Sequence, residues 1–332
     1  MTSSFLYERL TEGRPKCTGT LAEPKGTPES RFALQGTVNW MHGLTVLVQD
    51  GGINWSSMLG FYKSVPKHAA LEERAVNTAF EQLLMALHHL SALKAMADAD
   101  KDRDLARIAV MTWYYGIYCA ASAMIAAKDG SQQQDHAGTA RVWDRQIAAA
   151  GLAASPFHYR LTTLVKKDAE LEIAKLRSGN SFTLSSKPMS TADARGACMS
   201  YLSGTRGYRE WQITESLKVG ELAKRGLTDF RSAAGRKLRD ERLEGKSLGF
   251  LDQAFRYRGK ANYRDAMFLT YEAQVGTVIK GFVAGMETVL RAFVIMAGAF
   301  CSRRVAKKEW EAFGADLNAN LVLSLMPKDV WG

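Results

Sequence analysis

The chain has 332 residues, of which 46% are hydrophobic, and it carries a formal net charge of +10. That length and apolar content allow one large domain, or a domain with a sizeable insertion. Such an excess of positive charge is typical of proteins that bind a polyanion, such as RNA, DNA or an anionic membrane, although a basic surface can also serve solubility alone. The four cysteines lie far apart, so they offer no metal-binding spacing, and neither a metal nor a cofactor is expected.

The cysteines and the N-terminal residues indicate a reducing compartment. Cys119 and Cys301 lie inside apolar runs and are expected to be small buried side chains. The first residues, MTSSFLYERLTEG, contain two glutamates and no long apolar core, unlike a secretory signal. The expected location is therefore the cytoplasm.

Residues 1–66 are predicted to form an N-terminal arm. Residues 1–35 are rich in Pro, Gly, Thr and charge, which is typical of extended chain. After them the run LTVLVQ, the turn signal DGG and the run INW predict a small β-hairpin, although the same run could begin a helix.

Residues 67–332 are predicted to be an all-α domain. From His68 to Asp100, Leu, Ala and Met recur at three- and four-residue steps, which predicts one long helix. A second helix is expected from about Leu105 to Ala127, with Gly130 as its C-terminal cap. The two helices should pack against each other in antiparallel orientation.

Two apolar runs raise the question of a membrane. Residues 108–127 carry no charge over a length that could span a bilayer. Their mixture of tyrosines and alanines favours a core helix over a membrane span. The run 281–301 is less suited to span, because Glu287 and Arg291 lie four residues apart and would pair on one helical face. No membrane partner is therefore expected.

Residues 156–246 are predicted to form a basic insertion in the helical domain. Between residues 160 and 260 there are 21 Lys and Arg and 12 Asp and Glu, so this part carries a net +9 of the total +10. Helices are expected at 166–177, 191–203 and 208–224. The stretch Phe230–Arg242 fits two interpretations equally: a solvated helix face with ion pairs, or a surface that contacts phosphates.

Polar residues interrupt an apolar stripe on the helix predicted for residues 251–272. Leu251, Ala254 and Phe255 begin the stripe, and Arg258, Asn262 and Asp265 continue it. Polar groups on a buried face are costly unless they bond to one another or to a ligand. The pattern therefore indicates either a polar network that fixes helix packing or a binding site.

The same segment carries a family resemblance. The sequence from Arg258 to Tyr263, RGKANY, resembles the R-x-x-A-D-Y pattern found in a subset of HEPN-superfamily domains that lack the usual histidine, with Asn262 in place of Asp. Upstream, the run TWYYGIYCAASAMIAAKDG and the following loop with His136 are similar to the second helix of these domains and its loop. The resemblance covers roughly residues 70–130 and 250–300.

This resemblance implies a HEPN-like antiparallel helical bundle that dimerises, with two Arg-centred motifs facing each other across a basic cleft. HEPN proteins include metal-independent endoribonucleases of defence and toxin–antitoxin systems, in which Arg and His act on the 2′-hydroxyl and the scissile phosphate. Here Tyr263 takes the place of the histidine, and a phenol is a poor general base at neutral pH. Binding is therefore favoured over cleavage; in an enzyme, Arg258, Tyr263 and Asp265 would be the catalytic residues.

The sequence thus predicts a nucleic-acid-binding protein, with RNA favoured over DNA, that acts as a homodimer or as a subunit of a larger prokaryotic defence or toxin–antitoxin assembly. The alternatives are a metal-independent endoribonuclease and a non-catalytic structural or dimerisation protein. The residues expected to bind nucleic acid are Arg256, Arg258, Lys260, Asn262, Arg264, Arg236, Lys237 and Arg239.

Overall fold

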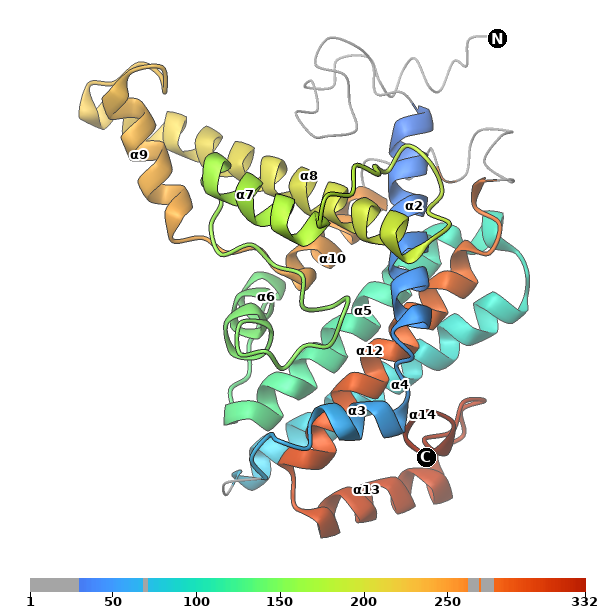
Figure 1. Cartoon of the computed structure of the whole chain (residues 1–332). Helices are drawn as coiled ribbons and strands as arrows, with labels where there is room; N and C mark the ends of the chain where they lie inside the picture. Colours follow the sequence, from blue (N-terminus) through green and yellow to red (C-terminus); the bar gives the residue numbers. More distant parts are fainter. Residues whose placement is uncertain (1–29, 68–70, 262–268, 270–277) are drawn as a thin grey trace.

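The computed structural model describes residues 30–67, 71–261, 269 and 278–332 (Figure 1). In this part of the chain nearly all regular structure is helical, and a single isolated antiparallel bridge, between Leu161 and Leu248, is the one β-type pairing. The all-α prediction is confirmed. The helices in chain order are α2 (Ser30–Asp50), α3 (Trp55–Phe61), α4 (Glu73–Asp98), α5 (Asp102–Asp129), α6 (His136–Trp143), η1 (Asp144–Ala148), α7 (Lys166–Arg177), α8 (Thr191–Leu217), η2 (Lys218–Leu222), η3 (Ala223–Arg225), α9 (Ala233–Glu244), α10 (Phe250–Gly259), α12 (Phe282–Arg304), α13 (Lys307–Asn320) and α14 (Lys328–Trp331).

Helices α4 and α5 form the predicted pair. Three residues, 99–101, connect them, and the two helices run side by side in opposite directions (Figure 1). Helix α5 ends at Gly130, whose φ of 79° and whose N–H bond to the carbonyl of Ala126 make it the predicted C-terminal cap. Helix α4 buries one long face, as its periodic pattern predicts, whereas the second half of α5 is buried on nearly all sides.

Helix α12 packs against both α4 and α5 and completes the centre of the fold. The expected pair on α12 is present, with Arg291 2.6 Å from Glu287. By length and composition α5 and α12 could each cross a membrane, but 67% and 78% of their most apolar windows are buried inside the protein. Trp113 and Ile117 of α5 are fully buried, as the core-helix interpretation predicts.

The predicted β-hairpin is wrong. The run LTVLVQ forms the last turns of α2, and INW leads into α3. Leu44, Leu47 and Val48 are buried whereas Val46 is only half-buried, so the run follows the helical period and not the alternation of a strand. The turn signal DGG ends a helix instead of joining two strands, and the side chain of Asn54 then caps α3 by accepting the Ser57 N–H at 3.0 Å.

The basic segment differs in detail from its prediction. The helices expected at 191–203 and 208–224 are one continuous helix, α8, which passes into η2 and η3. The first half of α8 belongs to the core, where Ala197 and Tyr201 are buried. Its second half, with η2, η3 and α9, projects from the body as an arm (Figure 1). We call residues 206–246 the arm; it is distinct from the N-terminal arm predicted for residues 1–66.

One hydrophobic core joins the early and late parts of the described chain. Its buried members run from Val38 on α2 to Trp331 on α14. Helix α2 packs on α8 and α12, so residues 30–66 share the core with the helices that follow. The division of the chain at residues 66, 156 and 246 stays a prediction, and residues 1–29 lie outside the described part.

Candidate nucleic-acid interface

The Arg258 guanidinium lies among aromatic rings. Its central carbon is 5.0 Å from the ring centre of Tyr114, 5.8 Å from that of Tyr115 and 5.1 Å from that of Phe255. One terminal nitrogen donates to the Tyr115 hydroxyl at 3.2 Å. The Nε atom is buried and has no hydrogen-bond partner among the described residues. The rings hold a partly desolvated cation that retains a free donor, which suits an anionic ligand.

The apolar stripe of α10 differs from the predicted one. Its buried face consists of Phe250, Leu251, Ala254 and Tyr257, whereas Phe255 is exposed. Arg258 therefore does not interrupt the buried stripe. It lies at the edge of that stripe, on the side of α10 that faces α5, and this position lets its guanidinium reach the tyrosine rings.

His136 lies beside the same rings. It is the first residue of α6, which begins after Asp135 accepts the Gly138 N–H at 2.7 Å. The imidazole is 4.5 Å from the Tyr118 ring and 5.8 Å from that of Phe255, measured between ring centres. Burial, assisted by the charge of Arg258, lowers the His136 pKa below its usual value. A neutral imidazole therefore lies close to a cation; we call Arg258, His136 and their rings the Arg258–His136 cluster.

Arg256 points in another direction. It donates to the Thr205 hydroxyl at 3.0 Å and lies over the rings of Tyr208 and Tyr201, at 5.1 and 5.7 Å. These contacts join α10 to α8. Arg256 is thus placed as a packing residue between two helices, and Lys260, at the end of α10, is half-buried.

Four of the predicted site residues lie outside the described part of the chain. These residues are Asn262, Tyr263, Arg264 and Asp265. Their predicted roles in binding or catalysis stay predictions.

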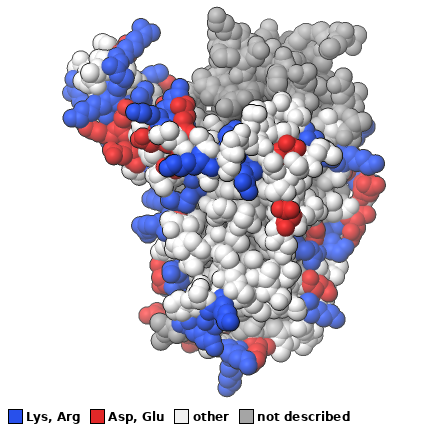
Figure 2. Space-filling model, viewed as in Figure 1, with Lys and Arg blue, Asp and Glu red and all other residues white. Residues whose placement is uncertain are grey.

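The predicted phosphate ligands on α9 take part in local contacts. Arg236 donates to the carbonyl of Arg231, Lys237 lies 3.9 Å from Glu241, and Arg239 lies 2.8 Å from Asp240. Figure 2 shows blue and red side chains intermingled on the arm, whereas the middle of this face of the body is mostly uncharged. Exposed pairs of this kind are weak and leave their cations available. Both interpretations of Phe230–Arg242 therefore stay open.

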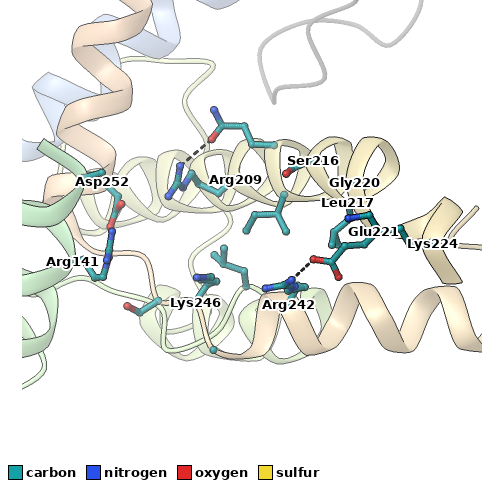
Figure 3. A pocket seen from close by; sticks show the side chains of 16 residues that line it. Arg141, Arg209, Ser216, Leu217, Gly220, Glu221, Lys224, Arg242, Lys246 and Asp252 are labelled. Carbon is teal, nitrogen blue, oxygen red and sulfur yellow. Dashed lines mark hydrogen bonds and ion pairs between the residues drawn. The ribbon is translucent and has the colours of Figure 1, made fainter. Parts of the chain in front are cut away.

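A groove of about 860 Å³ lies between the arm and the body (Figure 3). It is lined by α6, α8, η2, η3, the end of α9 and the start of α10. Its charged lining residues are five cations, Arg141, Arg209, Lys224, Arg242 and Lys246, and two carboxylates, Glu221 and Asp252. We call it the basic groove. Four of its cations, Arg209, Lys224, Arg242 and Lys246, lie in the basic insertion predicted for residues 156–246, although only Arg242 belongs to the stretch Phe230–Arg242.

The two carboxylates do not cancel the positive charge of the groove. Glu221 is engaged by Arg242 at one end (Figure 3). Asp252 lies at the other end beside Arg141, and its burial raises its pKa, which Arg209 and Arg141 oppose. Neither Lys224 nor Lys246 forms an ion pair with the described residues. The groove therefore presents net positive charge to solvent.

The basic groove and the Arg258–His136 cluster share two helices. Ala137 and Arg141 of α6 line the groove, and His136 begins that helix. Asp252 of α10 also lines it, while Arg258 lies near the end of the same helix. The basic groove and the Arg258–His136 cluster are therefore connected through α6 and α10.

Comparison of this chain with protein-family models, curated proteins and solved structures found no match. The HEPN resemblance therefore stays a prediction that rests on its short motifs.

Proposed function

We propose that the protein binds RNA through phosphate contacts in the basic groove. The observation that supports this proposal is the lining of the groove, where five cations from several helices face two carboxylates that are themselves engaged or buried. Arginine, lysine and polar uncharged side chains make most protein contacts to nucleic-acid backbones. Ser216, Ser247 and Gln212 also line the groove and supply such uncharged groups.

The extent of the groove favours a polyanion over a single small anion. Figure 3 shows Arg141 at one end, Lys224 at the other and Lys246 between them, so the cations are spread along its length. Spread cations match the repeated phosphates of a strand and do not converge on one ligand atom. Arg258 adds a cation beyond the α6 end, beside the exposed ring of Phe255, which is suited to stacking with an unpaired base.

The salt dependence of RNA binding tests this proposal. Each lost phosphate contact reduces the slope of log K against log salt concentration by about 0.7 for a single strand. Arg209→Gln and Lys246→Gln should each weaken binding of a labelled oligoribonucleotide for every sequence and flatten this slope by about that amount. Fluorescence anisotropy across a series of salt concentrations measures both quantities.

Lys308→Gln is the matched control, because Lys308 is an exposed cation on α13, at the far end of the body from the arm. It should leave both affinity and slope unchanged. RNA binding that is independent of salt, or equal losses in the control and the groove variants, would contradict the proposal.

A second function, metal-independent endoribonuclease activity, is favoured by the Arg258–His136 cluster. A neutral imidazole can accept the proton of a 2′-hydroxyl, while the guanidinium neutralises the adjacent phosphate. The 2′-oxygen would attack phosphorus, the P–O5′ bond would break, and the 5′-oxygen would take a proton from the imidazolium or from water, which leaves a 5′-hydroxyl and a 2′,3′-cyclic phosphate. The sequence places Tyr263 at the position of the catalytic histidine, whereas His136, from another helix, lies beside the rings that surround Arg258, among them those of Tyr115 and Phe255.

RNA cleavage in the absence of metal ions distinguishes endoribonuclease activity from RNA binding alone. RNA incubated with the protein in EDTA should be cut, and His136→Asn and Arg258→Ala should each reduce the rate by about 10²- to 10⁴-fold. His88→Asn, an exposed histidine of α4, is the control. Binding without cleavage leaves the protein as an RNA-binding subunit, and cleavage that persists in His136→Asn removes His136 from the mechanism.

The wider setting rests on the HEPN resemblance alone. We propose a cytoplasmic homodimer or a subunit of a prokaryotic defence or toxin–antitoxin assembly. Sedimentation of the purified protein, with and without RNA, tests the oligomeric part: a monomer in both conditions would contradict the homodimer.

A further inference from the structure

A second, smaller pocket of about 80 Å³ lies on the other side of α6 from the basic groove. Ala137 lines the groove and Thr139 lines the small pocket, and two residues along a helix correspond to about 200° of rotation. The lining residues are uncharged: Thr78, Gln82, Tyr118, Ser122, Ile125, Ser131, Gln132, Gln133 and Thr139.

The pocket presents free hydrogen-bonding groups. The side-chain amides of Gln82, Gln132 and Gln133 make no hydrogen bond within the described residues. The hydroxyl oxygen of Ser131 is buried and likewise has no partner there. A buried polar atom without a partner costs free energy unless a ligand or water satisfies it. The pocket therefore offers amide donors, amide acceptors and a hydroxyl to a polar guest.

The uncharged lining and the small volume of this pocket indicate which class of ligand it can bind. The absence of a charged residue in the lining disfavours a phosphate, and the mixture of donors and acceptors beside the Tyr118 ring suits a flat, neutral heterocycle. A volume of 80 Å³ holds about five to eight water-sized groups, which is enough for one pyrimidine ring and small for a purine. A glutamine amide can both donate to and accept from the polar edge of a base, because it carries an NH2 group and a carbonyl oxygen.

We infer that this pocket binds one unpaired pyrimidine base of the RNA. Tyr118 links it to the phosphate site, because its ring lines the pocket and also contacts the His136 imidazole, with ring centres 4.5 Å apart. A strand whose phosphates lie at Arg258 thus has a base within reach of the pocket. The inference rests on the proposed function, since the groove brings the strand to this end of α6.

Nucleosides test the pocket without involving phosphate. Saturation-transfer NMR of uridine, cytidine, adenosine and guanosine with the full-length protein should show binding of a pyrimidine nucleoside above that of the purines. Gln82→Leu and Gln133→Leu keep the side-chain size and remove the amide, so each should reduce the pyrimidine signal at least about fivefold. Gln49→Leu, an exposed glutamine at the end of α2, should leave it unchanged.

A second measurement connects the pocket to RNA. Wild-type protein should bind oligouridylate or oligocytidylate more tightly than oligoadenylate, and Gln82→Leu should remove this preference while keeping the salt slope. Binding of no nucleoside, equal binding of purines, or full pyrimidine binding by Gln82→Leu would overturn the inference. Pyrimidine binding that survives alongside salt-independent RNA binding would instead remove the groove proposal and leave the pocket standing.

Discussion

Arg258 lies near the end of α10, where its side chain contacts residues of a second helix, α5. The sequence singled it out because a cation followed apolar residues on one helix. In the structure, what distinguishes Arg258 is its surroundings: the rings of Tyr114 and Tyr115, which belong to α5, lie around the guanidinium. No local pattern on α10 predicts that these two tyrosines surround Arg258, because α5 and α10 are about 140 residues apart in the sequence. His136 was noticed as a loop histidine, but its approach to Arg258 depends on the packing of α6.

Arg258→Lys should behave almost like Arg258→Ala in RNA binding. A lysine ammonium lacks the planar, delocalised group that lies among these rings, and its donors cannot bind two phosphate oxygens in the fixed fork geometry of a guanidinium. We expect a loss of about tenfold in RNA affinity for both variants, measured by anisotropy at fixed salt. Full affinity in Arg258→Lys would show that only the charge at this position matters.

Asp144 and Arg160 form the best-defined buried ion pair in the described residues. Both carboxylate oxygens accept from the guanidinium at 2.9 Å, and the Asp144 side chain is only 2% exposed. Arg160→Ala leaves that carboxylate buried and unpaired, so the free energy of unfolding should fall by about 3 kcal/mol in urea denaturation. Lys166→Ala, which breaks an exposed pair with Glu170, should change it by less than about 0.5 kcal/mol.

At the scale of elements, long periodic helices were predictable and short ambiguous runs were not. Helices α4, α5 and α7 follow their patterns closely. Helices α4 and α7 each bury one face, whereas α5 buries one face in its first half and nearly every residue from Cys119 to Ala127. The run LTVLVQ has the composition of a strand, but the core that receives Leu44 and Leu47 is built by α8 and α12, far along the chain. Tertiary packing therefore decided between hairpin and helix.

Asp102, the first residue of α5, binds the start of α12, which lies about 180 residues later in the sequence. Its carboxylate begins α5 and accepts the N–H groups of Gly281 and Val283, at 2.7 and 2.9 Å, at the start of α12. Asp102→Ala should therefore lower the free energy of unfolding by about 1 to 2 kcal/mol. Asp104→Ala, at an exposed acidic residue in the same first turn, is the comparison. Equal losses in the two variants would assign the effect to α5 alone.

At the scale of the molecule, the net charge predicted a polyanionic partner but not where it would bind. The arm carries 11 Lys and Arg against 7 Asp and Glu, and many of them pair with one another. Four of the five cations of the basic groove belong to this arm, and the fold adds Arg141 from α6, which lies outside the basic segment. A site assembled from separate helices is set by the fold, so composition indicates its chemistry and the structure indicates its position.

Histidine burial should make the whole fold sensitive to acid. Burial lowers the pKa of His42, His89, His136 and His158, and for His42 the value falls to about 4, with Lys187 acting in the same direction and Asp102 opposing it. An unfolded histidine has a pKa of about 6.5. Between pH 6.5 and pH 4 the unfolded chain therefore binds more protons than the native one, so the free energy of unfolding falls as the pH falls.

The variant His42→Leu measures how much one histidine contributes to the pH dependence of the free energy of unfolding. Each proton contributes a slope of at most about 1.4 kcal/mol per pH unit, so the variant should flatten the dependence of unfolding free energy on pH by up to that amount between pH 4 and 6.5. The Nε2 atom of His42 is buried without a partner among the described residues, so leucine should not lower stability at pH 7 by more than about 1 kcal/mol. Urea denaturation at several pH values measures the slope, with the exposed His88→Gln as control. An unchanged slope in His42→Leu would mean that His42 stays protonated in the native protein or is not buried there.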